Sequence, residues 1–242
     1  MAHANFIKDR LTLVVFCREP IPNRTKTRLV KYLGAEGAAA LAEAFIGDAL
    51  AKGRSLGPAQ LVIAGTGPGA VEQSAFFRAI ARRFDAPLID QGAGGLGARM
   101  RRALAPFAER GVILIGTDTP SIPATMLAQS AAALARNHMV LGPSLDGGYY
   151  LVGARGALPD IFRGIRWGRP DVLAATLGRL KRDGIRCALG PGWYDVDRWD
   201  DVKLLAAHLN AMRPERAANP ASTPCPATAR VLARLGLLRT GG

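Results

Sequence analysis

Short apolar runs alternate with longer amphipathic stretches along most of the chain. The runs are rich in Val, Ile and Leu, as in strands buried on both faces of a parallel sheet. We expect strands at residues 11–17, 60–64, 87–90, 112–115, 139–142, 149–152 and 186–189. Because strands and helices take turns along the sequence, the pattern predicts an α/β fold with a mostly parallel central sheet.

The intervening stretches carry apolar residues at helical spacing. We expect helices at residues 25–53, 72–84, 98–109, 123–136, 170–182 and 198–212, with a break in the first near residues 34–37. Beyond Arg213 prolines recur among Ala, Ser and Thr, which is typical of a connector. The chain therefore divides into one domain over residues 1–212 and, over residues 213–242, a proline-rich connector with a short helix at 227–238.

Length and composition limit the class of protein. The 242 residues suffice for one large α/β domain. No apolar run approaches the roughly 18 residues of a membrane helix, and polar residues interrupt the N-terminal segment where a signal peptide needs an apolar core. The three cysteines lie too far apart for a zinc or disulfide pattern. We expect a cytoplasmic protein without a membrane span.

The chain is strongly basic, with a formal net charge of +13. Such a charge indicates either a nucleic-acid partner or an anionic substrate. Aromatic residues make up only 6% of the chain, so few rings are available to stack on bases. We therefore expect no nucleic-acid partner, and the charge indicates either an anionic substrate or a genome composition that favours arginine.

The sequence GTDTP at residues 116–120 directly follows the expected strand at 112–115. Ligands of open α/β sheets bind at the carboxyl ends of the strands, which makes Asp118 the first candidate site residue. A carboxylate there can hold a divalent cation, and the cation can hold a diphosphate. A purely structural role in a turn or helix cap stays open for Asp118.

Three cationic residues, Arg24, Lys26 and Arg28, stand between the first expected strand and the helix after it. Cations and unpaired N–H groups at a helix start form an anion site. This loop and Asp118 belong to the same edge of the predicted sheet. We expect the loop to bind an anion, although a basic run is also typical of a solvated surface.

Further acidic residues follow later strands. Asp146 precedes Gly147 and Gly148, where the backbone can approach a ligand closely, although Asp-Gly is also a strong hairpin-turn signal. Asp195 and Asp197 alternate in an extended segment, so both can face the same side. Either can bring a second carboxylate to a cation on Asp118, and capping the helix at 198–212 is the rival role for Asp197.

A glycine motif supports a different class of protein. GAGGLG at residues 92–97 matches the dinucleotide fingerprint G-x-G-x-x-G, and Asp118 follows at about the distance of a ribose-binding acid. That fingerprint usually sits on the first strand of its domain, whereas two strand–helix units precede it here. An NAD(P)-binding oxidoreductase therefore remains a lesser alternative.

Several motifs in order resemble a bacterial family. They are REPIPNRTKTRL (18–29), GGLGARM (94–100), GTDTP (116–120), LGPSLDGGYYLVG (141–153) and YDVDRWDD (194–201). Together they are similar to the uncharacterised glycosyltransferase-like family DUF2064, in the GT-A nucleotide-diphospho-sugar transferase superfamily, whose relatives include the molybdenum-cofactor and phospholactate guanylyltransferases. The sequence departs from the family pattern at Asn23, where a glycine is usual, and at Gly95, where an acidic residue is common.

The resemblance implies a GT-A Rossmann-like three-layer α/β/α sandwich, with a nucleotide over the first half of the sheet and Mg²⁺ or Mn²⁺ on the strand-end aspartate. We expect catalytic roles for Asp118, Asp146 and Lys26, and metal ligands among Asp118, Asp195 and Asp197. The expected nucleotide contacts are Arg18, Arg24, Lys26, Arg28, Gly97 and Thr117. The expected acceptor contacts are Asp146, Gly147, Gly148, Tyr149 and Trp167.

The leading hypothesis is a metal-dependent glycosyltransferase that uses a nucleotide-diphospho-sugar and a small-molecule acceptor. The alternative is a nucleotidyltransferase that joins an NTP to a phosphorylated or phosphonate substrate and releases pyrophosphate, since R-x-K beside the first strand resembles the triphosphate-binding loop of those enzymes. A nucleotide-binding protein without catalysis is a further alternative, because Asn23 and Gly95 are altered. Assembly as a homodimer is left open.

Overall fold

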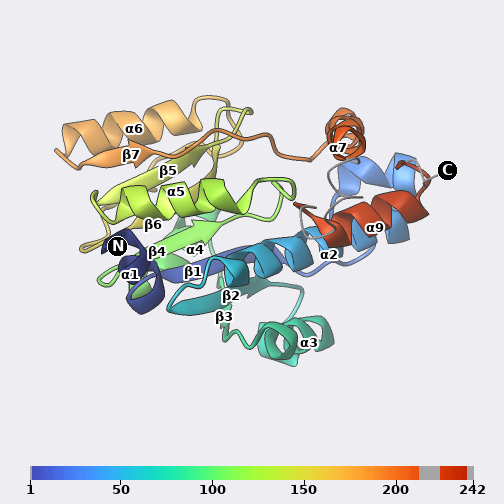
Figure 1. Ribbon diagram of the computed structural model, residues 1–242, viewed down its shortest axis with the longest axis horizontal. Coiled ribbons are helices and arrows are strands. Elements are labelled where there is room, and N and C mark those ends of the chain that lie inside the picture. Colours follow the sequence, from blue (N-terminus) through green and yellow to red (C-terminus); the bar gives the residue numbers. More distant parts are fainter. Residues whose placement is uncertain (1, 213–223, 239–242) are drawn as a thin grey trace.

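The computed structural model describes residues 2–212 and 224–238, which form a twisted sheet with helices on both faces (Figure 1). Within these residues the sheet has seven strands in the order β3-β2-β1-β4-β6-β5-β7. The strands are β1 (Thr12–Arg18), β2 (Gln60–Thr66), β3 (Leu88–Asp90), β4 (Val112–Ile115), β5 (Met139–Pro143), β6 (Tyr149–Ala154) and β7 (Cys187–Leu189). Only β6 runs antiparallel to its neighbours, so the predicted mostly parallel sheet is confirmed.

Helices cover the sheet in two layers. They are α1 (Ala2–Asp9), α2 (Val30–Ser55), α3 (Ala75–Phe84), α4 (Leu96–Leu104), α5 (Ala124–Leu134), α6 (Val172–Arg182), α7 (Trp199–Ala211) and α9 (Pro226–Arg234), with 3₁₀ turns at Thr27–Leu29, Val71–Gln73 and Ala105–Phe107. Leu50 of α2 and Leu127 of α5 pack in the core on one face, whereas Leu104 of α4 and Leu180 of α6 pack on the other. The three-layer α/β/α sandwich is therefore confirmed.

Two local features depart from regular helix. The expected break in the first long helix is confirmed at Gly34, whose φ of 69° and ψ of 168° lie outside the helical region. Helix α1 was not expected from the sequence. Its Phe6 packs so closely on Gly111 that a Cβ there would lie 2.7 Å from the ring, which ties α1 to the body of the domain.

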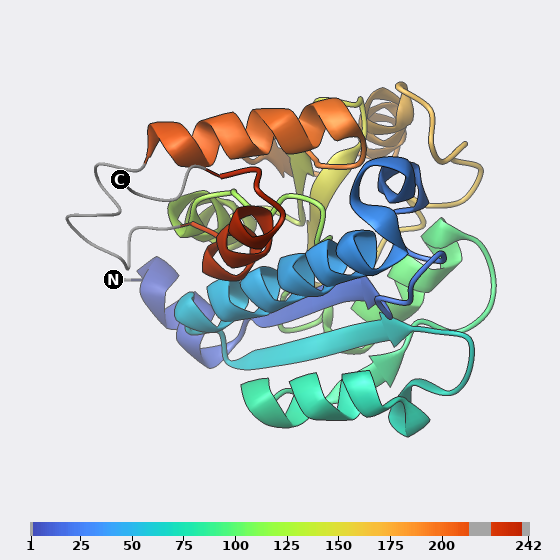
Figure 2. The ribbon, with the colours of Figure 1, turned by 90° about the vertical axis from the view of Figure 1, so that its right-hand side faces the viewer.

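The C-terminal helix α9 lies beside α2 (Figure 2). The two carboxylate oxygens of Asp48, a buried residue of α2, accept hydrogen bonds from the backbone N–H groups of Ala227 (2.9 Å) and Thr228 (2.8 Å). One turn along α2, the ammonium group of Lys52 donates to the carbonyl oxygen of Pro120 at 2.8 Å. These contacts link α9, through α2, to the loop that carries Asp118. The connector expected before α9 falls largely on residues 213–223, outside the described residues.

In the described part of the chain, no helix has the length and apolar character needed to cross a membrane.

Candidate active site

A cleft of about 660 Å³ opens at the edge of the sheet where β1 and β4 end. It gathers nearly all the site residues expected from the sequence, from loops far apart along the chain. The expected residues that line it are Arg18, Arg24, Lys26, Arg28, Thr117, Asp118, Asp146, Gly148, Tyr149, Trp167, Asp195 and Asp197. Gly97 and Gly147 lie beside the cleft and do not line it.

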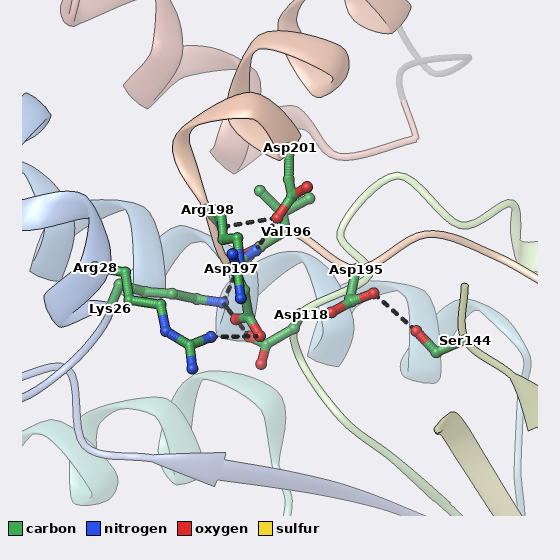
Figure 3. Close-up of polar contacts among 9 residues, drawn as sticks. All are labelled: Lys26, Arg28, Asp118, Ser144, Asp195, Val196, Asp197, Arg198 and Asp201. Carbon is green, nitrogen blue, oxygen red and sulfur yellow. Dashed lines mark hydrogen bonds and ion pairs between the residues drawn. The ribbon is translucent and has the colours of Figure 1, made fainter. Parts of the chain in front are cut away.

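At one end of the cleft the ammonium group of Lys26 is held by three oxygens (Figure 3). Its Nζ lies 2.7 Å from Oδ1 of Asp118 and 2.8 Å from Oδ1 of Asp197, and it donates a 2.7 Å hydrogen bond to the carbonyl oxygen of Val196. The Lys26 side chain is only 7% exposed and its ammonium also lies over the ring of Phe45 at 5.2 Å. Both carboxylates therefore point at the Lys26 ammonium.

The chain folds so that residues 193–197 run along the carboxyl edge of the sheet. Trp193 pairs in parallel with Ser144, the residue after β5: its N–H donates to the Pro143 carbonyl and its own carbonyl accepts from the N–H of Leu145. Three residues further along, the N–H of Val196 donates to the carbonyl of Asp118 in the GTDTP loop at 2.8 Å. This backbone bond brings Asp197 beside Asp118.

The alternation of Asp195 and Asp197 places both at the cleft, but with different partners. Asp197 turns toward Lys26, whereas Oδ1 of Asp195 accepts a 2.8 Å hydrogen bond from the Ser144 hydroxyl (Figure 3). Residues two apart in an extended chain are separated by about 6–7 Å. Asp197 is therefore the better partner for Asp118 around one cation.

The rival role proposed for Asp197, capping the last large helix, is not what the structure shows. The carboxylate of Asp201 accepts hydrogen bonds from the backbone N–H groups of Asp197 (2.9 Å) and Arg198 (2.7 Å), and so caps α7. The Asp197 carboxylate does not cap the helix and contacts Lys26 instead.

Charge pairing and burial set the protonation of these groups. Burial alone lowers the pKa of Lys26, but the carboxylates of Asp118 and Asp197 outweigh it and raise that pKa. Burial opposes ionisation of Asp197, yet Lys26, then Arg28 and Arg198, bring its pKa below the ordinary value. Burial, with the nearby Asp146, raises the pKa of Asp195. These shifts keep Lys26 an ammonium and Asp197 a carboxylate at neutral pH.

On the other side of the cleft, Asp146 lies in a tight turn. Its Oδ1 accepts a hydrogen bond from the N–H of Gly148 at 2.9 Å, so the expected Asp-Gly turn is confirmed. Gly147 has a φ of 88°, and a Cβ there would lie 2.0 Å from the carbonyl oxygen of Pro170. The turn is therefore fixed against the segment before α6, and the Asp146 carboxylate still lines the cleft.

Tyr149 and Trp167 form the wall next to this turn, with rings edge to face at 6.1 Å. Burial raises the pKa of the Tyr149 phenol, so it stays protonated at neutral pH. Gly97 lies behind the wall, where a Cβ would come within 2.9 Å of Phe162 and 3.0 Å of Trp167. Gly97 thus allows α4 to pack against the wall.

The sheet order does not fit the dinucleotide interpretation of the glycine motif. The glycines follow β3, which is an edge strand, whereas Asp118 follows β4. Strands β2 and β1 lie between them, so Asp118 is not on the strand next to the glycine loop as a ribose-binding acid must be. The strand order therefore argues against the alternative ribose role of Asp118.

Sequence reasoning missed several residues of the cleft. Arg99 lines it and is fixed by hydrogen bonds from Nε to the Gly92 carbonyl (3.1 Å) and from Nη2 to the Thr66 hydroxyl (3.3 Å). Arg169 also lines it, as does Ser144, the partner of Asp195. Arg99 belongs to the GGLGARM motif, and Ser144 lies two residues before Asp146. Their position within or beside these motifs is the sequence feature that could have predicted them as cleft residues.

The oxygens around Lys26 suit Mg²⁺ or Mn²⁺. No group of three or more His, Cys, Asp or Glu side chains gathers as a metal site among the described residues. Mg²⁺ nevertheless binds through one or two carboxylates and takes its other ligands from phosphates and water, and Mn²⁺ accepts the same oxygen donors. Asp118 and Asp197 could supply those carboxylates, and the carbonyl of Val196, which also contacts the Lys26 ammonium, could supply a third oxygen.

The architecture matches that of GT-A-like transferases. The chain is similar over 93% of its length to a protein from Desulfovibrio desulfuricans G20 assigned provisionally as a nucleotide-diphospho-sugar transferase, with 28% identity, a TM-score of 0.77 and 96% of that chain covered. More distant structures share the fold alone. The inositol-1-phosphate CTP transferase from T. maritima has a TM-score of 0.54 at 13% identity, with 93% of this chain and 97% of that chain covered. Glucosyl-3-phosphoglycerate synthase from Mycobacterium tuberculosis, solved with Mn²⁺ and UDP, has a TM-score of 0.53 at 12% identity, with 99% and 84% covered.

The family follows from the sequence itself. Residues 49–169, half of the chain, match the family described as uncharacterized protein conserved in bacteria (DUF2064). The chain belongs to this family. No curated protein matches the sequence.

Proposed function

We propose that the protein is a metal-dependent glycosyltransferase that takes a sugar from a nucleotide diphosphate and passes it to a small-molecule acceptor. The observation that carries this proposal is the convergence of the Asp118 and Asp197 carboxylates on the Lys26 ammonium of the basic loop, where the same oxygens could bind a divalent cation. The similarity to the Desulfovibrio protein supports a nucleotide-sugar donor. Mg²⁺ or Mn²⁺ held there supplies positive charge against the diphosphate that leaves.

The donor's phosphates are assigned to the basic side of the cleft. Arg24 and Arg28 flank Lys26 in the loop after β1, and Arg18 stands at the end of that strand. Guanidinium groups offer a planar pair of N–H donors to phosphate oxygens, and the lysine offers a compact charge. Thr117, next to Asp118, lines the same region. These residues orient the diphosphate so that the sugar projects toward the Asp146 side.

The acceptor is assigned to the cleft wall made by Asp146, Tyr149 and Trp167. Asp146 orients the acceptor hydroxyl and takes its proton as the oxygen bonds to the anomeric carbon. The bond from that carbon to the phosphate oxygen breaks, and the nucleoside diphosphate leaves with the electron pair. Aromatic rings beside Asp146 exclude water, which favours transfer over hydrolysis of the donor.

A nucleotidyltransferase is the second candidate, and the excess of cations in the cleft favours it. Besides the loop cations, Arg99 and Arg169 line the cleft, and such a charge suits a triphosphate. In that reaction a phosphate or phosphonate oxygen of the second substrate attacks the α-phosphorus of an NTP. Pyrophosphate then leaves, so the leaving group distinguishes the two reactions.

The test is to identify the product. Purified protein with Mn²⁺ is incubated with UDP-, GDP-, ADP- and CDP-sugars or with NTPs, together with a mixture of candidate acceptors. The proposal predicts release of a nucleoside diphosphate from one nucleotide sugar, lost in Asp118→Asn. Release of pyrophosphate from an NTP would establish the second candidate instead, and binding without turnover of any donor would indicate a protein without catalysis.

A further inference from the structure

The ammonium group of Lys26 occupies the point on which the metal-site oxygens converge. Three oxygens, from Asp118, Asp197 and the Val196 carbonyl, surround it at 2.7–2.8 Å. These are hydrogen-bond distances for an ammonium, and the same donors bind a divalent cation when it comes closer. One group of oxygens cannot hold both cations, because the two positive charges repel at such short range.

We propose that Lys26 is an internal counter-cation that a divalent metal ion must displace from Asp118 and Asp197. The displaced ammonium then binds the phosphate of the nucleotide that arrives with the metal. This inference rests on the proposed function, since it assumes that metal and nucleotide bind in this cleft. The new element is that, when metal and nucleotide bind together, the metal takes the place of Lys26 on the two carboxylates and Lys26 binds the nucleotide phosphate.

The local structure allows this exchange to take place in the side chain alone. The backbone of Lys26 is fixed, because its carbonyl accepts the N–H of Leu29 at 2.8 Å and the preceding Thr25 hydroxyl donates to the Glu19 carbonyl at 2.9 Å. The four-carbon stem of the lysine side chain is flexible, so the ammonium can move while the backbone of the loop stays in place. Lys26 also lines the cleft, where the phosphates are expected.

The neighbouring Arg28 does not share this position. Its guanidinium approaches the other oxygen of Asp197 only to 4.0 Å, and its side chain is 66% exposed. Arg28 thus contributes charge near the site without occupying the point of convergence. This contrast provides a matched control, because removing either residue removes one positive charge beside the same carboxylates.

The exchange makes metal and nucleotide binding mutually dependent. A metal ion alone must displace the ammonium and gains only the protein oxygens and water. When a nucleotide diphosphate is present, its oxygens bind both the metal and the released lysine. Each ligand then strengthens the binding of the other by the same factor.

The test is a titration of Mn²⁺ alone, followed by electron paramagnetic resonance, into wild type, Lys26→Met and Arg28→Met. Lys26→Met should bind Mn²⁺ at least about tenfold more tightly than wild type, a factor equivalent to about 1.4 kcal/mol. Arg28→Met should gain much less, because it relieves only repulsion at longer range. Equal gains in the two variants, or no gain in Lys26→Met, would overturn the exchange.

A measurement on the wild-type protein does not depend on the folding of a variant. Lys26 should resist acetylation by an N-hydroxysuccinimide ester in EDTA, because its side chain is buried, and become reactive when Mn²⁺ is added. Mass spectrometry of the modified peptide reads the change, with the exposed Lys203 as internal reference. Unchanged protection of Lys26 at saturating Mn²⁺ would also overturn the proposal.

Failure of the exchange and failure of the proposed function give different results. If wild type binds Mn²⁺ and Asp118→Asn does not, the metal site stands, and an absent gain in Lys26→Met removes the exchange alone. If none of these proteins binds Mn²⁺, even with a nucleoside diphosphate, both the metal site and the exchange are wrong.

Discussion

Asp118 and Asp197 hold the same ammonium group, although one follows β4 and the other ends the extended segment before α7. Their Oδ1 atoms lie 2.7 and 2.8 Å from Nζ of Lys26. The two carboxylates remain 47% and 38% exposed to the cleft, so a ligand can reach them from solvent. This arrangement brings Lys26 of the basic loop, Asp118 after β4 and Asp197 before α7 into one site.

Asp118→Asn should remove the metal dependence of nucleotide binding while preserving the fold. The substitution keeps the shape of the side chain but removes the charge that a divalent cation requires. We expect affinity for a nucleoside diphosphate in Mn²⁺ to fall at least about tenfold, to the level seen in EDTA. Isothermal titration calorimetry measures the affinity, and circular dichroism checks the fold. Unchanged affinity would remove Asp118 from the metal role.

Asp197→Asn and Asp195→Asn form a matched pair of neighbouring carboxylates on one segment. Asp197 shares the Lys26 ammonium with Asp118, whereas Asp195 accepts a hydrogen bond from the Ser144 hydroxyl. Asp197→Asn should therefore weaken Mn²⁺ binding about as much as Asp118→Asn, and Asp195→Asn should change it far less. The reverse order of effects would show that Asp195 is the second metal ligand.

Gly147→Ala should destabilise the protein and disturb the acceptor side of the cleft. The new Cβ would meet the Pro170 carbonyl at 2.0 Å, and the positive φ of 88° adds strain of about 1–2 kcal/mol. Gly156→Ala is the control, because Gly156 has a similar φ of 86° but open space around it. Urea denaturation should show a clearly larger loss of unfolding free energy for Gly147→Ala. Equal losses would mean that the Pro170 contact contributes nothing.

Asp48→Ala should loosen the C-terminal helix from the body. It leaves the N–H groups of Ala227 and Thr228 without their acceptor and removes the negative charge near the buried Lys52. We expect a loss of about 2–4 kcal/mol in unfolding free energy. Hydrogen exchange should show faster exchange in α9 and, through Lys52 and Pro120, in the loop of Asp118. Faster exchange in α9 alone would separate the helix from that loop.

Lys52 predicts a specific pH dependence of stability. Burial is the main cause that lowers its pKa from 10.5 to about 8, against a smaller opposing effect of nearby charges. The folded state therefore binds fewer protons than the unfolded state between about pH 8 and 10.5. This group makes unfolding free energy rise with pH in that window, by about 3 kcal/mol at most.

The comparison that isolates this group is wild type against Lys52→Met, measured by urea denaturation at pH 7 and pH 9.5. The advantage of wild type over Lys52→Met should be larger at pH 9.5. Groups that titrate in the same range without interacting with Lys52, such as Cys187, whose pKa burial raises to about 11, cancel in the difference. A difference that does not change with pH would contradict the prediction.

The order of elements and the edge of the sheet that carries the site followed from the sequence, because both depend on local patterns. The apolar runs marked the strands, and Asp118 directly follows one of them. Which of Asp195 and Asp197 lies beside Asp118 could not be predicted from the sequence, because both residues fit the same alternation pattern. The choice depends on where Trp193 joins β5 and where Val196 meets the GTDTP loop, which are contacts between distant parts of the chain.

Other features were hidden for similar reasons. Lys26 was expected to bind phosphate, and nothing local indicated that its ammonium lies between two carboxylates. Helix α1 was missed because its eight residues carry too short an apolar pattern to be distinguished from a polar terminus. The glycine motif left a dinucleotide site open as an alternative, because its spacing fits a fingerprint whose meaning depends on strand order, and strand order is visible only in the fold.

The most direct test of the central claim is a thermal-shift experiment on wild type and Asp118→Asn. Each protein is heated with nucleotide sugars, NTPs or NAD(P), in Mn²⁺ or in EDTA, because a ligand that binds only the folded state raises Tm. We predict that a nucleotide sugar stabilises wild type strongly in Mn²⁺ and much less in EDTA, and that it stabilises Asp118→Asn in Mn²⁺ no more than it stabilises wild type in EDTA. Equal stabilisation of the two proteins in Mn²⁺, or stabilisation by NAD(P) alone, would contradict this prediction.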